Sequence, residues 1–104
     1  MANKEIEAIN EAWLKVPFGD TLAEWRVAFE GFGAMFPPAA DVEFEPVEAG
    51  GVPGEWSITP GADRGRAILY FHGGGYCMGS TKSHRHLASE IGRSANAPVL
   101  SLDY

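Results

Sequence analysis

The feature that most constrains the fold is an apolar segment that runs directly into consecutive glycines. Residues 67–71 are Ala-Ile-Leu-Tyr-Phe, and residues 72–75 are His-Gly-Gly-Gly. A short continuous apolar run is typical of a strand that is buried on both faces. Residues 83–95 then have helical spacing, and residues 99–102 form a second apolar run. This order predicts a β-α-β unit with parallel strands and a right-handed crossover.

The helix expected at 83–95 has an apolar stripe and a candidate cap. Its Leu87, Ala88, Ile91 and Ala95 share one face. Ser83 is the expected N-cap, because its hydroxyl can accept a hydrogen bond from the first turn.

The segment before this unit has strand character. Apolar and other residues alternate over 42–48 and 52–59, and Gly50-Gly51 lies between the two runs. A pair of glycines joins strands readily in a tight turn, so these residues predict a β-hairpin.

Two helices are expected near the N-terminus. Residues 4–15 have helical spacing, with Asn3 as N-cap, and a second helix starts at Thr21, where Glu24 completes a capping box. The second helix has an apolar stripe and ends at glycines and prolines before residue 39; the stripe consists of Leu22, Trp25, Phe29 and Phe32. The stripe fits a core helix as well as a lid over an apolar pocket, because both roles need an apolar face.

The glycine loop is the part of the sequence that indicates chemistry. Glycines lack a Cβ atom and adopt positive φ, so consecutive N–H groups can converge on one small oxygen. Acyl transfer passes through a tetrahedral intermediate with a negatively charged oxygen, which such amides stabilise. Removing one donor of this kind typically costs about 2.7–4 kcal/mol of transition-state stabilisation.

The sequence around this loop resembles the bacterial hormone-sensitive-lipase-like esterases, which have the α/β-hydrolase fold. The resemblance rests on a strand, then His72-Gly73-Gly74-Gly75, then a helix. Three flanking segments are similar as well and extend the resemblance over residues 40–104; they are residues 50–56, residues 79–80 with 84–85, and residues 101–104.

The resemblance implies an architecture and a set of site residues. It implies an α/β fold, with a helical cap at 1–40 and the first part of the hydrolase core at 41–104, ending before the nucleophile elbow. The Gly73 and Gly74 amides would face the oxyanion, His72 would brace the loop rather than transfer protons, and Gly75 would complete the motif. Five following residues would lie near the substrate pocket: Tyr76, Cys77, Met78, Gly79 and Ser80. The nucleophile, acid and base of such enzymes come later in the sequence, so we expect the chain alone to be inactive.

Other readings of the glycine loop are weaker. A dinucleotide fingerprint would need glycine at Met78, and a phosphate loop would need Gly-Lys-Ser/Thr, whereas residues 79–82 have a different order. A flexible turn is the simplest alternative, but the flanking strand and helix favour the oxyanion loop. Residues 92–96 nearly match G-x-S-x-G but end in Asn96, so Ser94 is expected to be a solvated helix residue.

Three residue types could suggest other sites. His84 and His86 lie two apart on a helix and point to different sides, so no metal site is expected. Asp103 follows an apolar strand, which favours a structural hydrogen-bonding role over a catalytic one. Cys77 is the single cysteine, so no disulfide can form within the chain.

Charge and chain ends limit the partners. The formal net charge of -6 gives no electrostatic support for nucleic-acid binding. No apolar run reaches the ~18 residues of a membrane span, and residues 1–10 lack a secretory signal, so a cytoplasmic protein is expected. The expected partner is a small acyl ester, with no cofactor.

The C-terminus suggests a fragment. The chain ends at Tyr104, directly after an apolar strand, so we expect a piece of a longer protein that self-associates or forms a homo-oligomer. The alternative function is a segment of a non-catalytic ligand-binding protein of the same fold, because such proteins can keep the glycine loop.

Overall fold

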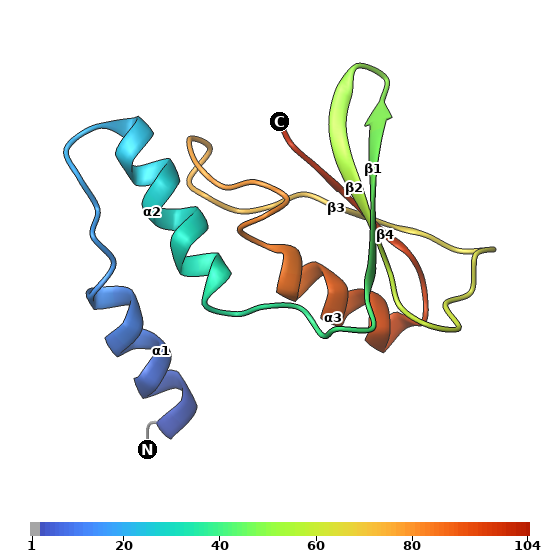
Figure 1. Cartoon of the computed structure of the whole chain (residues 1–104), viewed down its shortest axis with the longest axis horizontal. Coiled ribbons are helices and arrows are strands. Elements are labelled where there is room, and N and C mark those ends of the chain that lie inside the picture. The colour runs from blue at the N-terminus through green and yellow to red at the C-terminus, as the bar shows by residue number, and fades with distance from the viewer. Residues whose placement is uncertain (1–2) are drawn as a thin grey trace.

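A computed structural model describes residues 3–104 of the chain and contains three helices and four strands (Figure 1). In chain order these are α1 (Lys4–Leu14), α2 (Leu22–Ala34), β1 (Glu43–Ala49), β2 (Val52–Ile58), β3 (Ile68–Tyr70), α3 (Arg85–Ala95) and β4 (Val99–Leu102). The expected pair of helices, hairpin and β-α-β unit are all present. The strand expected at 67–71 is shorter than predicted, because only its middle three residues pair with a neighbour.

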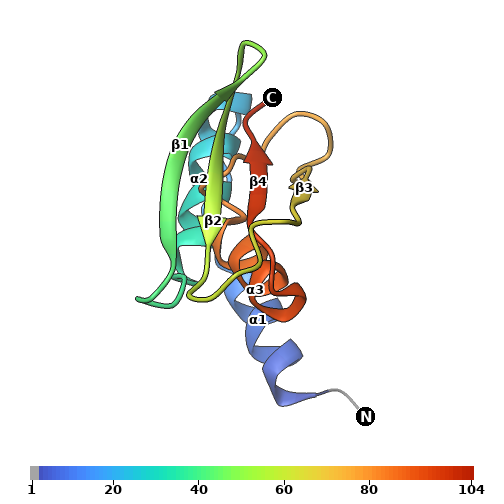
Figure 2. The ribbon, with the colours of Figure 1, turned by 90° about the vertical axis from the view of Figure 1, so that its right-hand side faces the viewer.

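The strands form one mixed sheet in the order β1-β2-β4-β3. β1 and β2 form the predicted hairpin, and its turn residues Gly50 and Gly51 have φ of 60° and 89°. β3 and β4 are parallel, and α3 crosses between them behind the sheet in Figure 2, which gives the expected right-handed connection. The sequence did not predict that β2 pairs antiparallel with β4, placing Gly54 opposite Leu102.

All three helices lie on the same side of the sheet, behind the strands in Figure 2. α3 packs against β2 and β4 through small residues: Ala88, Ser89 and Gly92 are its buried positions. Val99 is fully buried beneath them. The face with helical spacing is therefore not buried as a whole. Ala88 is buried, but Leu87 is 49% exposed, because the helix approaches the sheet on its small-residue side.

A partly buried ion pair joins α3 to the hairpin. The Arg85 guanidinium donates to both carboxylate oxygens of Glu55, with Nε at 3.0 Å and an Nη at 2.6 Å. Glu55 is 9% exposed, and the same guanidinium lies 4.8 Å from the centre of the Phe44 ring. This fork geometry satisfies the carboxylate that the sheet buries, and no local pattern of the sequence signals it.

The predicted helix caps are confirmed at the N-terminus and wrong at α3. Asn3 Oδ1 accepts from the Glu5 amide at 2.8 Å, and Thr21 and Glu24 form the reciprocal capping box. α3 begins after His84 without a side-chain cap, because the Ser83 hydroxyl instead bonds the Ser80 backbone.

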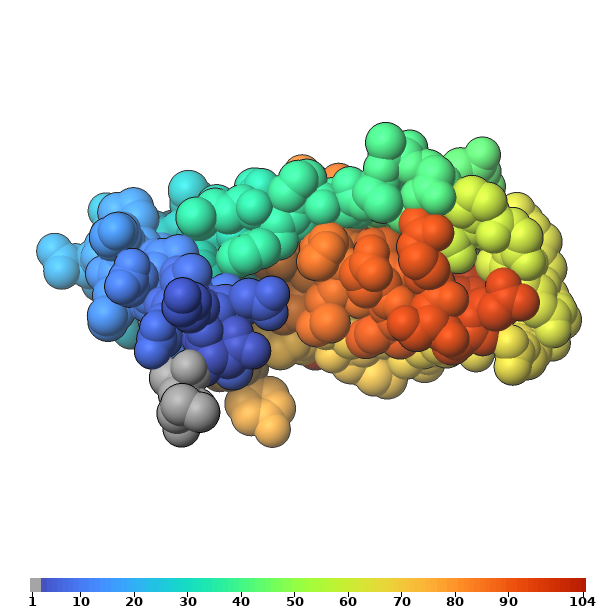
Figure 3. All heavy atoms as spheres, turned by 90° about the horizontal axis from the view of Figure 1, so that it is seen from below, coloured from blue at the N-terminus to red at the C-terminus, as the bar shows by residue number. Residues whose placement is uncertain are grey.

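The molecule is flattened, with principal extents of 42 × 38 × 22 Å. Seen from below in Figure 3, the blue atoms of α1 lie at one end and the yellow atoms of the loop before β3 at the other. Within residues 3–104, no helix is long and apolar enough to cross a membrane.

Candidate active site

The glycine loop leaves the sheet at the carboxyl end of β3. Residues 72–84 connect this end to α3, which returns to the parallel strand β4. In open parallel α/β sheets, the carboxyl ends of the strands are where ligands bind. The predicted loop therefore occupies the edge of the sheet at which a site is expected.

Gly74 is the residue that gives the loop its shape. Its φ is 143°, which residues with a side chain rarely adopt, and a Cβ here would overlap the Met78 carbonyl. The Gly74 carbonyl accepts from the Cys77 amide at 3.3 Å and from the Met78 amide at 3.1 Å. The loop thus folds back on itself around this one carbonyl group.

His72 is buried at the base of the loop and has three structural contacts. Its Nδ1 donates to the Gly73 carbonyl at 2.9 Å, and its ring stacks on Tyr104 with centroids 4.4 Å apart. The Tyr104 hydroxyl donates to the His72 carbonyl at 2.6 Å. Nε2 of His72 is buried without a hydrogen-bond partner among the described residues. These contacts are what a side chain that braces the loop would make.

His84 packs against the other side of His72. The two rings are stacked with centroids 5.8 Å apart, and His84 also contacts Phe29 and Tyr70. Its Nδ1 is 2.8 Å from the Ser83 hydroxyl. Burial lowers the pKa of His84 below its ordinary value, and the neighbouring His72 lowers it further. His84 is half-buried directly before α3, whereas His86 on the first turn of the helix is exposed, so the two side chains point to different sides as expected.

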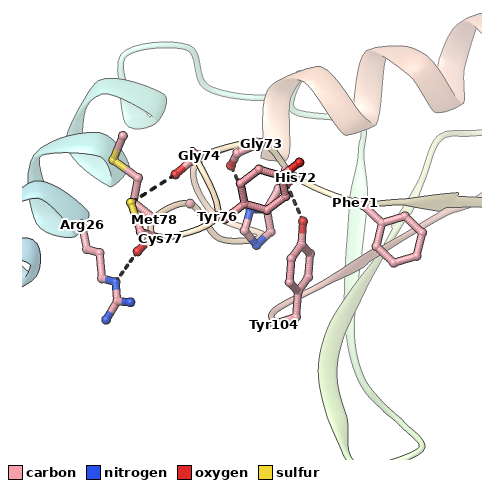
Figure 4. A pocket seen from close by; sticks show the side chains of 11 residues that line it. Arg26, Phe71, His72, Gly73, Gly74, Tyr76, Cys77, Met78 and Tyr104 are labelled. Atoms are coloured by element: carbon pink, nitrogen blue, oxygen red, sulfur yellow. Dashed lines mark hydrogen bonds between the residues drawn. The ribbon is translucent and has the colours of Figure 1, made fainter.

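A hollow of about 790 Å³ opens beside the loop (Figure 4). Its lining includes His72, the three glycines of the motif, and four of the five residues predicted near a substrate: Tyr76, Cys77, Met78 and Gly79. Ser80, the fifth of these residues, does not line the hollow; it exchanges hydrogen bonds with Ser83.

Three further lining residues were missed by the sequence analysis: Arg26, Phe71 and Tyr104. Phe71 and Tyr104 continue the two parallel strands, so their places at the carboxyl edge could have been inferred from the predicted topology. Arg26 lies on α2 and reaches the loop from 51 positions away, where its Nε donates to the Cys77 carbonyl at 2.8 Å. No local pattern could have indicated this contact.

The N–H groups of the three motif glycines have no protein partner among residues 3–104. None of the hydrogen bonds there uses the N–H groups of Gly73, Gly74 or Gly75. All three glycines line the hollow. Backbone N–H groups without a protein partner can bind an oxygen that carries negative charge where they point into such a space.

Two residues that could be mistaken for catalytic groups, Asp103 and Ser94, behave as the sequence predicted. Asp103 accepts hydrogen bonds from the backbone amide and the hydroxyl of Thr81, so its role is structural. Ser94 is an exposed residue near the end of α3.

The chain is similar in sequence and in fold to known proteins. A family model described as the alpha/beta hydrolase fold matches residues 68–104. An acetyl-hydrolase from Streptomyces hygroscopicus is 46% identical over 83 residues, which are 76% of this chain and 26% of that protein. The crystal structure of an esterase from the bacterial hormone-sensitive lipase family superposes with a TM-score of 0.87 at 37% identity. It covers 100% of this chain, which corresponds to 36% of that one.

A second esterase structure, EstE5 soaked with p-nitrophenyl butyrate, has a TM-score of 0.85 at 36% identity, over 100% of this chain and 36% of its own. The chain thus spans about a quarter to a third of the length of these relatives. On its sequence and its strand order, the chain belongs to the hormone-sensitive-lipase-like α/β-hydrolases, of whose fold it has the N-terminal part.

Proposed function

We propose that these residues supply the oxyanion-hole loop of a serine carboxylic-ester hydrolase. The observation that carries the proposal is the pair of amides at Gly73 and Gly74, which have no recorded protein partner and line a hollow at the carboxyl end of β3. The family to which the chain belongs contains esterases and acetyl-hydrolases, which supports the same chemistry.

The loop would act in the step that forms the tetrahedral intermediate. A serine oxygen attacks the ester carbonyl, whose carbon–oxygen double bond opens as negative charge moves to the oxygen. The Gly73 and Gly74 amides would donate to that oxygen more strongly than to the neutral carbonyl. Glycine adopts the φ of 143° at position 74 without a steric conflict, and its bonded carbonyl holds the turn, so the amides would need little reorganisation during the reaction.

The other catalytic groups would come from outside these residues. No G-x-S-x-G elbow is present in the 104 residues, and Ser94 lies exposed near a helix end. We therefore expect no turnover from the chain alone. "Full-length enzyme" below means the protein in which these residues are joined to an elbow serine and its acid and base.

The substrate we infer is an ester of a short acyl group. One relative is named an acetyl-hydrolase, and EstE5 was soaked with a butyrate ester. A cytoplasmic location and a homo-oligomer stay predictions.

The proposal can be tested by a fusion. Residues 1–104 would replace the matching segment of the Streptomyces hygroscopicus acetyl-hydrolase, and hydrolysis of p-nitrophenyl acetate and butyrate would be measured. We expect the fusion to be active and the fusion with Gly74→Ala to be folded but at least about 100-fold slower, the loss typical of one missing oxyanion donor. Equal activity of the two fusions would contradict the proposal.

The coding sequence after Tyr104 provides an independent test. A serine elbow followed by a late histidine in the same reading frame is expected. Their replacement by other residues would favour the ligand-binding alternative.

A further inference from the structure

One face of α2 lies along the segment that contains the glycine loop. Arg26, Phe29 and Gly33 are spaced at i, i+3 and i+7, so they share this face. Arg26 bonds the Cys77 carbonyl, and Phe29 contacts His84 with ring centroids 5.6 Å apart. Figures 1 and 4 show the loop beside this helix.

Gly33 allows the close approach at the far end of this face. A Cβ at Gly33 would overlap the backbone of Ser83, so only glycine lets the helix approach this closely. The helix therefore meets residues 77–84 at three points along its length.

The contact of Arg26 is continuous with the turn that shapes the loop. The Cys77 carbonyl and the Met78 amide belong to one planar peptide unit. The carbonyl accepts from Arg26 Nε at 2.8 Å, and the amide donates to the Gly74 carbonyl at 3.1 Å. Fixing the plane of this peptide from one side therefore fixes the direction of the donor that holds Gly74 on the other.

We propose that Arg26 is a positioning residue of the oxyanion hole, which it sets through the Cys77–Met78 peptide. The inference rests on the proposed function for its effect on catalysis. Through this contact the N-terminal helical segment controls the geometry of Gly74, although no residue of that segment need touch the reacting atoms. α2 would then act as a core helix and also affect the site, because the face with which it packs would determine the geometry of the oxyanion hole.

The chemistry of arginine suits this position. A guanidinium stays charged at all relevant pH values and donates in a fixed plane, so it orients a carbonyl better than a flexible ammonium. Arg26 is also the one residue with a permanent charge among those that line the hollow in the described part of the chain. Its other nitrogens have no recorded partner among residues 3–104.

The first test measures the loop directly and needs no activity. Hydrogen exchange would be followed at the Cys77 and Met78 amides of the full-length enzyme, with and without Arg26→Met, which keeps an unbranched side chain. We expect faster exchange at these amides and unchanged exchange in the hairpin. Arg64→Met is the matched control, since Arg64 is exposed and far from the loop. Equal exchange in the Arg26 variant, or unprotected loop amides in the parent chain, would overturn the proposal.

The second test measures catalysis in the full-length enzyme. Arg26→Met should lower kcat about 10-fold with little change in KM, because small displacements of a catalytic group cost up to about 100-fold. Arg26→Lys should recover part of kcat. Gly33→Ala, which pushes the helix away, should cause a similar loss that does not add to that of Arg26→Met.

The outcomes separate the two proposals. An inactive parent enzyme that still shows the exchange effect would remove the esterase function and leave the positioning contact. An active parent with unchanged kcat in Arg26→Met would remove this inference and leave the function. Loss of activity only toward substrates that carry a carboxylate would show that Arg26 recognises charge, and would also overturn it.

Discussion

The carboxylate of Asp103 holds Thr81 by two hydrogen bonds, one from the amide at 2.7 Å and one from the hydroxyl at 3.1 Å. Thr81 is 5% exposed and lies between the glycine loop and α3, whereas Asp103 directly follows β4. The pair therefore fastens the end of the loop to the sheet at the point where the two parallel strands finish.

Replacing Asp103 with asparagine should destabilise the full-length enzyme by about 1–3 kcal/mol. Asparagine has one acceptor oxygen, so one buried Thr81 donor would face an NH2 group and lose its partner. Urea denaturation would measure the change. Asp20→Asn is the control, because Asp20 is exposed and its carboxylate has no recorded partner. Equal stability of the two variants would show that the Thr81 contact contributes nothing.

Gly74→Ala should reduce kcat by about 100-fold or more with a much smaller effect on KM. The added methyl would meet the Met78 carbonyl, and the φ of 143° is strained for alanine, so the amide would turn away from the oxyanion. Steady-state kinetics on a short p-nitrophenyl ester would test this. Gly31→Ala is the control, since no atom lies within 4 Å of a Cβ there. An unchanged kcat in a folded Gly74 variant would remove the oxyanion assignment.

The sequence predicted those parts of the fold that depend on neighbouring residues. Thr21 and Glu24 form a capping box because the two residues meet within one helical turn. Gly50 and Gly51 form the hairpin turn because both have positive φ. The carboxyl end of β3 followed from the apolar run itself. In each case the cause and the structure lie within a few residues of each other.

The parts that the sequence did not predict depend on where distant elements meet. Arg85 pairs with Glu55, and Arg26 bonds Cys77, only after α3 and α2 have docked. Ser83 has a good residue type for an N-cap, but its hydroxyl finds a partner in the Ser80 turn first. The helical spacing does not say which side of α3 meets the sheet, and Leu87 stays exposed because the small residues Ala88, Ser89 and Gly92 make the contact.

Maleimide labelling of Cys77 should inhibit the full-length enzyme. The thiol is half-buried in the wall of the hollow, with Sγ 3.6 Å from the Gly74 carbonyl, so a bulky adduct would displace the turn around that group. A bound ester analogue should slow the labelling. Cys77→Ser provides the control and should be insensitive to the reagent. Complete labelling with full activity would place Cys77 away from the site.

The stability of the loop region should fall in mild acid because of His84. Its pKa is lowered in the fold, chiefly by burial and then by His72, while the unfolded value is near 6.5. Below about pH 6.5 the unfolded chain therefore takes up a proton that the folded chain resists, and stability is lost as pH falls toward the lowered pKa. The titratable groups packed against this ring are His72 and Tyr70.

Thermal melts of the full-length enzyme between pH 5 and 8 would measure this dependence. His84→Gln cannot be protonated in that range and should flatten the curve. His86→Gln is the control, since His86 is exposed on the other side of α3. If both variants lost the same amount of thermal stability at acidic pH, another group would be responsible.

The isolated chain should self-associate through the open edge of β3. β3 is the last strand of the sheet and pairs only with β4, so its other edge carries unpaired backbone groups in the described residues. Leu69 in β3 is 52% exposed, and Phe71, which directly follows the strand, is 61% exposed. An exposed apolar edge strand favours pairing with another chain. The net charge of -6 opposes association, but salt screens it.

The Leu69→Lys variant shows whether the apolar edge or the net charge governs self-association. The substitution reduces the net negative charge, so a mechanism governed by charge predicts stronger association, whereas a mechanism governed by the apolar edge predicts weaker association. We expect size-exclusion chromatography at physiological salt to show the parent chain as oligomers or a broad peak, and Leu69→Lys to shift it toward the monomer. Val27→Lys, on the exposed side of α2, adds the same charge away from the sheet and should leave the profile unchanged. A sharp monomer peak with a cooperative thermal transition in the parent chain would show instead that these 104 residues fold as a self-sufficient domain.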